Sequence, residues 1–195
     1  MRSPAPARAL AALSGGVDSS VAALLAQRQG FQVTALTLAL PGADVEAARA
    51  TADRLGVQAH VVDAHELLER QVIVPFLDEH ERGRTPNPCV LCNALVKFPL
   101  LLEWADRLGC EKLVTGHYAR IEHAGGQFRL LRGADQRKEQ SYMLYRLRQE
   151  MLKRALFPVG ELAKKRVWEL AAEAGLLSAE REESQDVCFV TAGDT

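Results

Sequence analysis

A glycine-containing segment near the N-terminus constrains the fold of this 195-residue chain more than any other feature. Residues 14–20 read SGGVDSS and stand between an apolar run at 9–13 and an apolar helical run at 21–26. A strand, a glycine loop and a helix in this order present backbone N–H groups and the positive end of a helix to an anion. A tight turn with a serine cap would also explain the three residues SGG, so both interpretations stay open at this point.

The residue types within this segment suit a phosphate group. Gly15 and Gly16 permit a close backbone approach and positive φ angles. The hydroxyls of the segment can donate to phosphate oxygens, and Asp18 can help to hold a magnesium ion. A Walker A loop is excluded, because its lysine and its glycine spacing are absent.

Strand-like and helical runs alternate through the first 118 residues. We expect strands at 31–40, 57–62 and 112–115, helices at 44–55, 65–76 and 95–108, and an irregular segment at 83–93. This alternation predicts an α/β fold with a parallel sheet, whose ligands bind beyond the carboxyl ends of the strands. The glycine loop and Thr115-Gly116 both follow strands, so one pocket can include them.

The pattern changes after Tyr118. Residues 119–123 and 127–131, joined across Gly125-Gly126, predict a β-hairpin. Helices are expected at 139–147, 150–156 and 161–174. We therefore predict an α/β nucleotide-binding domain at 1–135 and a helical appendage at 136–195.

Composition and charge narrow the possible settings. No apolar run approaches the roughly 18 residues of a membrane span, and the N-terminus is too short for a signal peptide, so we expect a cytoplasmic protein without a membrane part. The net charge is −1, yet residues 129–166 carry eleven Lys or Arg against four Asp or Glu, a net of +7. Such a segment can follow a phosphate backbone, or merely solvate helices. The oligomeric state stays open.

Four cysteines in a cytosolic chain argue against a disulfide framework. Cys110 begins an expected core strand and is interpreted as an inert buried thiol. Cys89 and Cys92 form a C-x-x-C pair in the irregular segment just before a helix, whose N-terminus lowers a thiol pKa. A zinc site lacks its second ligand pair. Together with Cys188, the pair better suits an iron–sulfur cluster or redox sulfur chemistry.

Longer blocks resemble a known family. Residues 14–20 resemble the PP-loop of ATP pyrophosphatases, and GRTPNPCVLCN at 83–93 resembles the signature of tRNA-specific 2-thiouridylases. Similar blocks follow at 115–120, 138–142, 156–160 and 183–189, in the family's order. The resemblance covers residues 11–189 and implies the PP-loop (adenine nucleotide alpha hydrolase-like) sheet flanked by helices. It also implies that the family's C-terminal domains are lacking.

The resemblance implies an ATP-dependent sulfurtransferase. ATP, with Mg²⁺, would adenylate the C2 oxygen of the wobble uridine in tRNA, and sulfur would then replace that oxygen to give 2-thiouridine. Cys188 would carry a persulfide received from a sulfur-relay protein, and Cys92 would release the sulfur, leaving a transient Cys92–Cys188 disulfide. The sulfur donor is expected to be that relay protein or sulfide. By the same resemblance, ATP would be bound by Ala12, Leu13, Ser14, Gly15, Gly16, Val17, Asp18, Ser19, Ser20, Leu38 and Gly116.

The resemblance also implies a substrate site. Asn87, Pro88 and Cys89 would lie near the target base, and Lys138, Glu139 and Gln140 would contact tRNA. Cys89 stands where some relatives carry Asp, so Cys89, Cys92 and Cys188 are alternative ligands of a [4Fe-4S] cluster. The segment 38–45 lacks the aromatic and acidic residues usual there, so the adenine contacts can differ.

Three other functions remain open from the sequence. A PP-loop enzyme could thiolate a small-molecule nucleobase or nucleotide, although such a substrate would not need the basic segment. A non-catalytic fragment could bind tRNA or a nucleotide, although it would need neither Cys92 nor Cys188. A PP-loop amidase is a weaker fit, because no glutaminase half is present.

Overall fold

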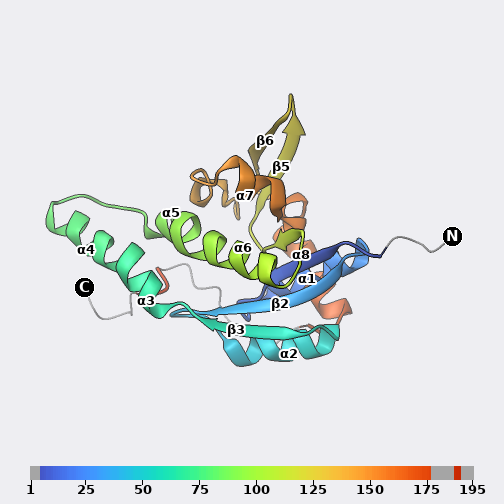
Figure 1. Cartoon of the computed structure of the whole chain (residues 1–195). Coiled ribbons are helices and arrows are strands. Elements are labelled where there is room, and N and C mark those ends of the chain that lie inside the picture. The colour runs from blue at the N-terminus through green and yellow to red at the C-terminus, as the bar shows by residue number, and fades with distance from the viewer. Residues whose placement is uncertain (1–4, 177–186, 190–195) are drawn as a thin grey trace.

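The computed structural model describes residues 5–176 and 187–189, and a parallel sheet forms the centre of this part (Figure 1). The strands of the described sheet lie in the order β3-β2-β1-β4-β7. Every pairing between them is parallel. The prediction of a parallel α/β fold is thus confirmed. The strand bounds are Arg8–Ala12 (β1), Gln32–Ala39 (β2), Ala59–Asp63 (β3), Lys112–Val114 (β4) and Ala155–Leu156 (β7).

Alternate residues of β1 enter two different hydrophobic clusters, because successive strand side chains point to opposite faces. Leu10 belongs to one cluster, and Ala9 and Ala11 belong to the other. The cluster with Ala9 contains buried residues of α1 (Val17–Arg28), α2 (Val45–Leu55) and α8 (Lys164–Glu173). These helices cover one face of the sheet. The central strands are buried along almost their whole length, so the other face must be covered as well.

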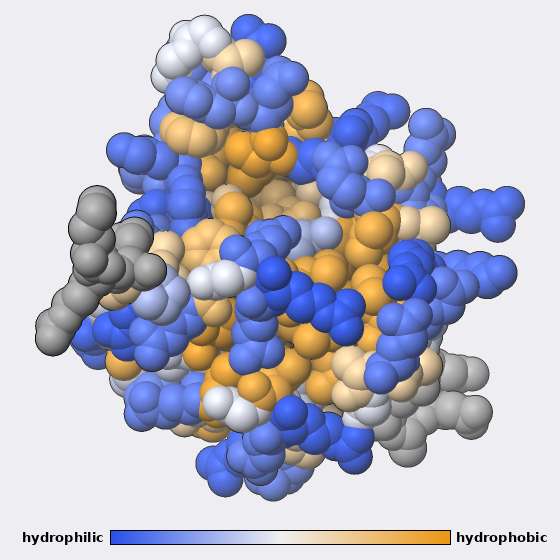
Figure 2. All heavy atoms as spheres, turned by 90° about the vertical axis from the view of Figure 1, so that its right-hand side faces the viewer, coloured by the Kyte–Doolittle hydropathy of each residue, from blue (hydrophilic) through white to orange (hydrophobic). Residues whose placement is uncertain are grey.

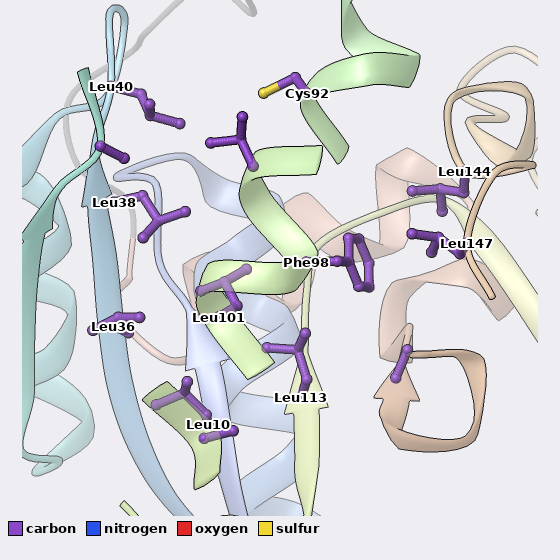
Figure 3. Packing of buried hydrophobic residues seen from close by; sticks show 14 of the residues in the cluster. Leu10, Leu36, Leu38, Leu40, Cys92, Phe98, Leu101, Leu113, Leu144 and Leu147 are labelled. Carbon is purple, nitrogen blue, oxygen red and sulfur yellow. The ribbon is translucent and has the colours of Figure 1, made fainter. Parts of the chain in front are cut away.

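A long helical run covers the other face. It comprises α5 (Pro88–Leu91), the π-helical turn η2 (Cys92–Lys97) and α6 (Phe98–Arg107). In Figure 3, Leu101 of this run lies between Leu36 and Leu113 of the sheet. The run Pro88–Arg107 is long and apolar enough to span a membrane by length and composition alone, but core helices meet the same criterion. Its buried residues pack in the hydrophobic core.

The segment after β3 forms a second interrupted helix. Its parts are α3 (His65–Leu68), the π-helical turn η1 (Glu69–Ile73) and α4 (Val74–Glu81). The expected helix at 65–76 is therefore present and extends further. α2 begins at its cap Asp44 and ends at Gly56, which has a φ of +64°, as its sequence predicts.

Two expectations about the middle of the chain are wrong. The irregular segment does not extend to residue 93, because α5 begins at Pro88. Proline is favoured at the first helical position, and the Asn87 side chain caps the helix by accepting from Cys89 N at 3.0 Å. Cys89 and Cys92 consequently lie within the first helical turns rather than in a loop before them.

The C-terminal part is less helical than expected. Residues 139–147 contain only the 3₁₀ turn η3 (Ser141–Met143). The helix expected at 150–156 ends early as α7 (Gln149–Arg154), and its last two residues form β7 beside β4. β7 is a strand of the central sheet and α8 packs against α1, while the division between domains at residue 135 stays a prediction.

The predicted hairpin is confirmed as β5 (Ala119–Ala124) and β6 (Gln127–Arg132), which pair antiparallel. It projects away from the sheet at the top of Figure 1. Figure 2 shows the face on the right of that view, where hydrophobic residues are visible at the centre between hydrophilic side chains. The 3₁₀ turn η4 (Pro158–Glu161) lies at the base of the hairpin.

Gly160 of η4 makes a contact that no other residue type would permit. A Cβ atom there would come 1.8 Å from the carbonyl oxygen of Ala119. We expect Gly160→Ala to lower the free energy of unfolding by at least about 3 kcal/mol, measured by urea denaturation. Gly16→Ala is the control, because a Cβ at Gly16 meets only Ser14 Oγ, at 3.6 Å. An equal loss in both variants would contradict the steric explanation.

Candidate functional site

The glycine loop joins β1 to α1 and packs on the start of α2. Gly15 has a φ of +84°, and a Cβ atom there would come 2.5 Å from Asp44 O. The backbone N–H of Asp44 donates to Ser14 O at 3.1 Å. Gly16 has an ordinary φ of −89° and caps α1, so only Gly15 needs the left-handed region. The predicted strand, loop and helix are therefore present, and the first turn of α1 follows the loop directly.

The serine hydroxyls of the loop hold its shape. Ser19 Oγ donates to Gly16 O at 2.9 Å and accepts from Ser14 N at 3.2 Å. Ser20 is buried, and its hydroxyl lies 3.2 Å from Thr51 Oγ1 on α2. The donation of these hydroxyls to phosphate oxygens stays a prediction.

Asp18, in the first turn of α1, is held by two residues that are distant in sequence. Lys164 Nζ lies 2.7 Å and 2.8 Å from its two carboxylate oxygens. The Tyr118 hydroxyl donates to Asp18 Oδ1 at 2.8 Å. The side chains of Lys164 and Asp18 are 12% and 28% exposed, so water screens this ion pair only in part. Both oxygens are engaged, and the role of Asp18 in holding a magnesium ion stays a prediction.

The segment after β4 lies directly against the glycine loop. A Cβ atom at Gly116 would come 2.6 Å from Ser19 N and 2.7 Å from the carbonyl carbon of Asp18. Only glycine permits this approach, which brings together the two strand ends that the sequence predicts as neighbours.

His117 follows in this segment and is held neutral. Its Nδ1 lies 2.8 Å from Thr115 Oγ1, and the rings of Phe98 and Phe157 flank it. Burial among these rings, with the nearby charge of Lys97, lowers the pKa of His117 to about 3.

The remaining predicted ATP-site residues lie close to these strand ends. Ala12 ends β1, Leu13 is buried and donates from its N–H to Leu36 O, and Val17 begins α1. Leu38 lies on β2 in the core (Figure 3). Their contact with a nucleotide stays a prediction.

The thiols of Cys92 and Cys188 approach the carboxyl end of β2 from two sides. The Cys92 sulfur points towards the side of Leu40 in Figure 3. Cys188 lies beside Gly42, where an added Cβ would be 3.5 Å from Cys188 Cβ. Phe189 packs edge-on against Phe76, with ring centroids 5.5 Å apart. The rest of the predicted block, residues 183–186, lies outside the described residues.

Burial controls the acidity of these thiols. It raises the pKa of Cys92 and that of Cys188, and the Cys89 thiol raises both further. The positive charge of Lys97 lowers the pKa of both thiols. The expected lowering of the Cys92 pKa by the helix N-terminus is therefore wrong, because desolvation of the thiolate outweighs it. Cys110 is buried beside β4, as predicted, and its pKa is also raised by burial.

The cysteines are also candidate metal ligands. Among residues 5–176 and 187–189, no group of three or more His, Cys, Asp or Glu side chains is arranged to hold a metal ion. All four cysteines are free thiols. A [4Fe-4S] cluster on Cys89, Cys92 and Cys188 therefore stays a prediction.

The residues expected near tRNA form two neighbouring groups. Pro88 is buried in the first turn of α5, and Cys89 beside it is half-buried. Gln140 Oε1 accepts from Tyr118 N at 3.0 Å, and Glu139 accepts from Ser141 N at 2.6 Å. Lys138 is half-buried in the same turn. Since η3 packs against α5, the two groups are neighbours in the fold.

Sequence reasoning missed the roles of Lys97 and Lys164. Lys97 is five residues after Cys92, which is about one turn of a π-helix. The motif around Lys97 did not indicate its effect on the pKa of the thiols. Lys164 is separated from Asp18 by 146 residues, and no local pattern signals that contact.

Comparisons with known proteins agree along almost the whole chain. The family model of the tRNA methyl transferase HUP domain matches residues 7–192. A tRNA-specific 2-thiouridylase, MnmA, from Geobacter metallireducens is 46% identical over 213 residues, which cover 100% of this chain and 58% of that protein. MnmA 3 from Bacteroides fragilis is 41% identical over 184 residues, covering 94% and 51%. The chain spans about half the length of the curated relatives it matches.

Solved structures share the fold. A 4-thiouridine synthetase in complex with RNA and bound ATP has a TM-score of 0.57 at 19% identity, covering 87% of this chain and 41% of that one. The U34-tRNA thiolase NcsA from Methanococcus maripaludis, with its [4Fe-4S] cluster, has a TM-score of 0.55 at 18% identity, covering 93% and 60%. At these identities the likeness concerns the fold alone.

Removing Lys164 would leave the Asp18 carboxylate partly buried without its cation. We expect Lys164→Met to lower the free energy of unfolding by about 2 kcal/mol in urea titrations. Lys165→Met is the control, because Lys165 is exposed on the same helix. In a double-mutant cycle with Asp18→Asn, the two losses should not add. Additive losses would show that the ion pair contributes nothing to stability.

Removing Lys97 would take away the charge that lowers the pKa of two thiols. We expect Lys97→Ala to raise the pKa of Cys92 and that of Cys188, so their alkylation by iodoacetamide at pH 8 slows several-fold. Mass spectrometry of the peptides measures each cysteine separately. Lys153→Ala, an exposed site, is the control and should leave both rates unchanged. Unchanged rates in Lys97→Ala would contradict the electrostatic role.

Proposed function

Because this chain belongs to the family of the tRNA methyl transferase HUP domain, we propose that it is the ATP-using catalytic part of a tRNA-uridine 2-sulfurtransferase. In this proposal it adenylates the C2 oxygen of the wobble uridine and replaces that oxygen with sulfur. Its relatives named tRNA-specific 2-thiouridylase are 41–46% identical to it. The substrate and the cytoplasmic setting are part of the proposal.

One observation carries the proposal: the glycine loop and two thiols gather at the same edge of the sheet. The loop contacts Asp44, and Gly42, two residues earlier, lies beside Cys188. Cys92 points towards the same end of β2 (Figure 3). An activating group and a sulfur-carrying group must meet on one substrate atom, and a shared strand edge supports that requirement.

The glycine loop would serve the activation step. The N-terminus of α1 favours the negative charge of a phosphate group, and Gly116 lets the β4 end approach it closely. The uridine C2 oxygen would attack the α-phosphorus of ATP, and pyrophosphate would leave. The product is an adenylate, whose AMP is a good leaving group at C2.

The two thiols would serve the sulfur step. Cys188 would carry the incoming sulfur as a persulfide: its thiolate attacks the outer sulfur of a relay protein's persulfide, and the relay protein's thiolate leaves. The Cys92 thiolate attacks Sγ of Cys188, the bond to the outer sulfur breaks, and sulfide leaves as the Cys92–Cys188 disulfide forms. Sulfide then attacks C2, the C2–O bond breaks and AMP departs. An external dithiol reduces the disulfide for the next cycle.

The thiols should be needed only after activation. With unmodified tRNA and ATP, we expect Cys188→Ser and Cys92→Ser to release pyrophosphate in a first turnover. Both should lose 2-thiouridine formation by at least about a hundredfold. Cys188→Ser has no thiol to hold the persulfide, and Cys92→Ser has no thiol to form the disulfide that releases sulfide. Pyrophosphate release is followed by an enzyme-coupled assay and 2-thiouridine by mass spectrometry of the digested tRNA.

Cys110→Ser is the matched control, since Cys110 is a buried thiol beside β4, away from the other three. It should retain both activities. Full thiolation by Cys188→Ser would overturn the sulfur route. Pyrophosphate release with a free nucleotide but not with tRNA would instead favour a small-molecule thiolase.

A further inference from the structure

Two tyrosines on the turn before α7 are exposed without a packing role. Tyr142 is 50% exposed and Tyr145 is 69% exposed. In contrast, Leu144 and Leu147 of the same turn are buried and lie close to Phe98 in Figure 3. The leucines account for the anchoring of the turn, so the hydrophobic core does not explain the two aromatic rings.

The geometry of the turn brings the two rings to one side. Leu144 N donates to Ser141 O at 2.9 Å, and Leu147 N donates to Leu144 O at 2.9 Å. Hydrogen bonds three residues apart close turns of about three residues, in which residues i and i+3 share a side. Tyr142 and Tyr145 therefore face solvent together, as Leu144 and Leu147 face the core together.

The turn adjoins the segment that carries Cys89. Its first part, η3, packs against α5, and in Figure 1 the loop before α7 lies beside α5. Cys89 and Glu139 are close enough to Tyr142 to act on its hydroxyl electrostatically. The turn that carries the exposed rings thus lies beside the segment of Cys89 rather than on a remote surface.

Two arginines lie on the same turn as the rings. Arg146 and Arg148 are exposed on the same turn, and within the described part of the chain neither forms an ion pair with a carboxylate. Exposed aromatic rings beside unpaired guanidinium groups match the chemistry of single-stranded nucleic acid. Unpaired bases stack on such rings while their phosphates attract the cations.

We propose that Tyr142 and Tyr145 form a stacking surface for unpaired bases of the RNA loop that holds the target uridine. This inference rests on the proposed function, because it places the bound RNA at the thiol side of that site. A base in a duplex is already stacked on its neighbours, so the surface selects loops over paired stems. It also gives the turn a role in holding the splayed loop while one base enters the site.

The test measures binding of the 195-residue chain to a fluorescent RNA hairpin with an unpaired loop. We expect Tyr145→Ala and Tyr142→Ala each to weaken binding about tenfold, and Tyr145→Phe to keep most of the affinity, because the ring remains. A fully paired RNA of equal length should bind weakly and with no difference between variants. Leu77→Ala is the matched control, since Leu77 is 53% exposed on α4.

Salt dependence separates stacking from charge. The tyrosine variants should shift affinity equally at low and high salt, whereas Arg146→Gln should reduce the slope of affinity against salt. Loop binding that is unchanged in both alanine variants would overturn the stacking surface and leave the proposed function standing. Failure of the unsubstituted chain to bind any tRNA or hairpin would overturn both. Equal weakening with the paired RNA would mean that the rings do not select unpaired bases.

Discussion

The ion pair between Asp18 and Lys164 joins two segments that are 146 residues apart in the sequence, directly beside the glycine loop. Asp18 lies in the first turn of α1, and Lys164 begins α8 on the same face of the sheet. Tyr118, from the β4–β5 connection, donates to the same carboxylate. Three segments therefore converge on one half-buried charge, and the loop cannot shift without disturbing all of them. An anionic ligand at this helix end would meet a preformed and partly neutralised site.

Burial and sulfur chemistry oppose each other at the thiols. The buried Cys92 thiol resists ionisation, which protects it from unwanted oxidation but slows nucleophilic attack, whereas Cys188 is exposed and only partly desolvated. Lys97 reduces this conflict, because its charge favours both thiolates. The site therefore combines two thiols whose pKa is raised by desolvation with a cation whose charge favours their thiolate forms.

The sequence predicted the strands and helices whose periodicity runs over many residues, such as β2 and α2. It also predicted that Gly116 meets the glycine loop, because carboxyl ends of parallel strands share one edge. It failed where the pattern is too short or the contact too distant. β7 has two residues, which show no period, and Lys164 reaches Asp18 across the fold. The start of α5 had a local signal, Asn87 followed by Pro88, but the surrounding prolines favoured a loop.

The direction in which the Cys92 thiol points depends on the π-helical turn η2. An α-helix turns by about 100° per residue, so a turn widened by one residue rotates everything before it relative to everything after it. Phe98 and Leu101 anchor the later part in the core, and Cys92 begins the widened turn. Loss of one residue from this turn would restore a regular helix and rotate the Cys92 thiol around the helix axis relative to Phe98 and Leu101. The buried residues Pro88 and Val90 of α5 would rotate with it, so the position of the thiol and the packing of α5 both depend on the widened turn.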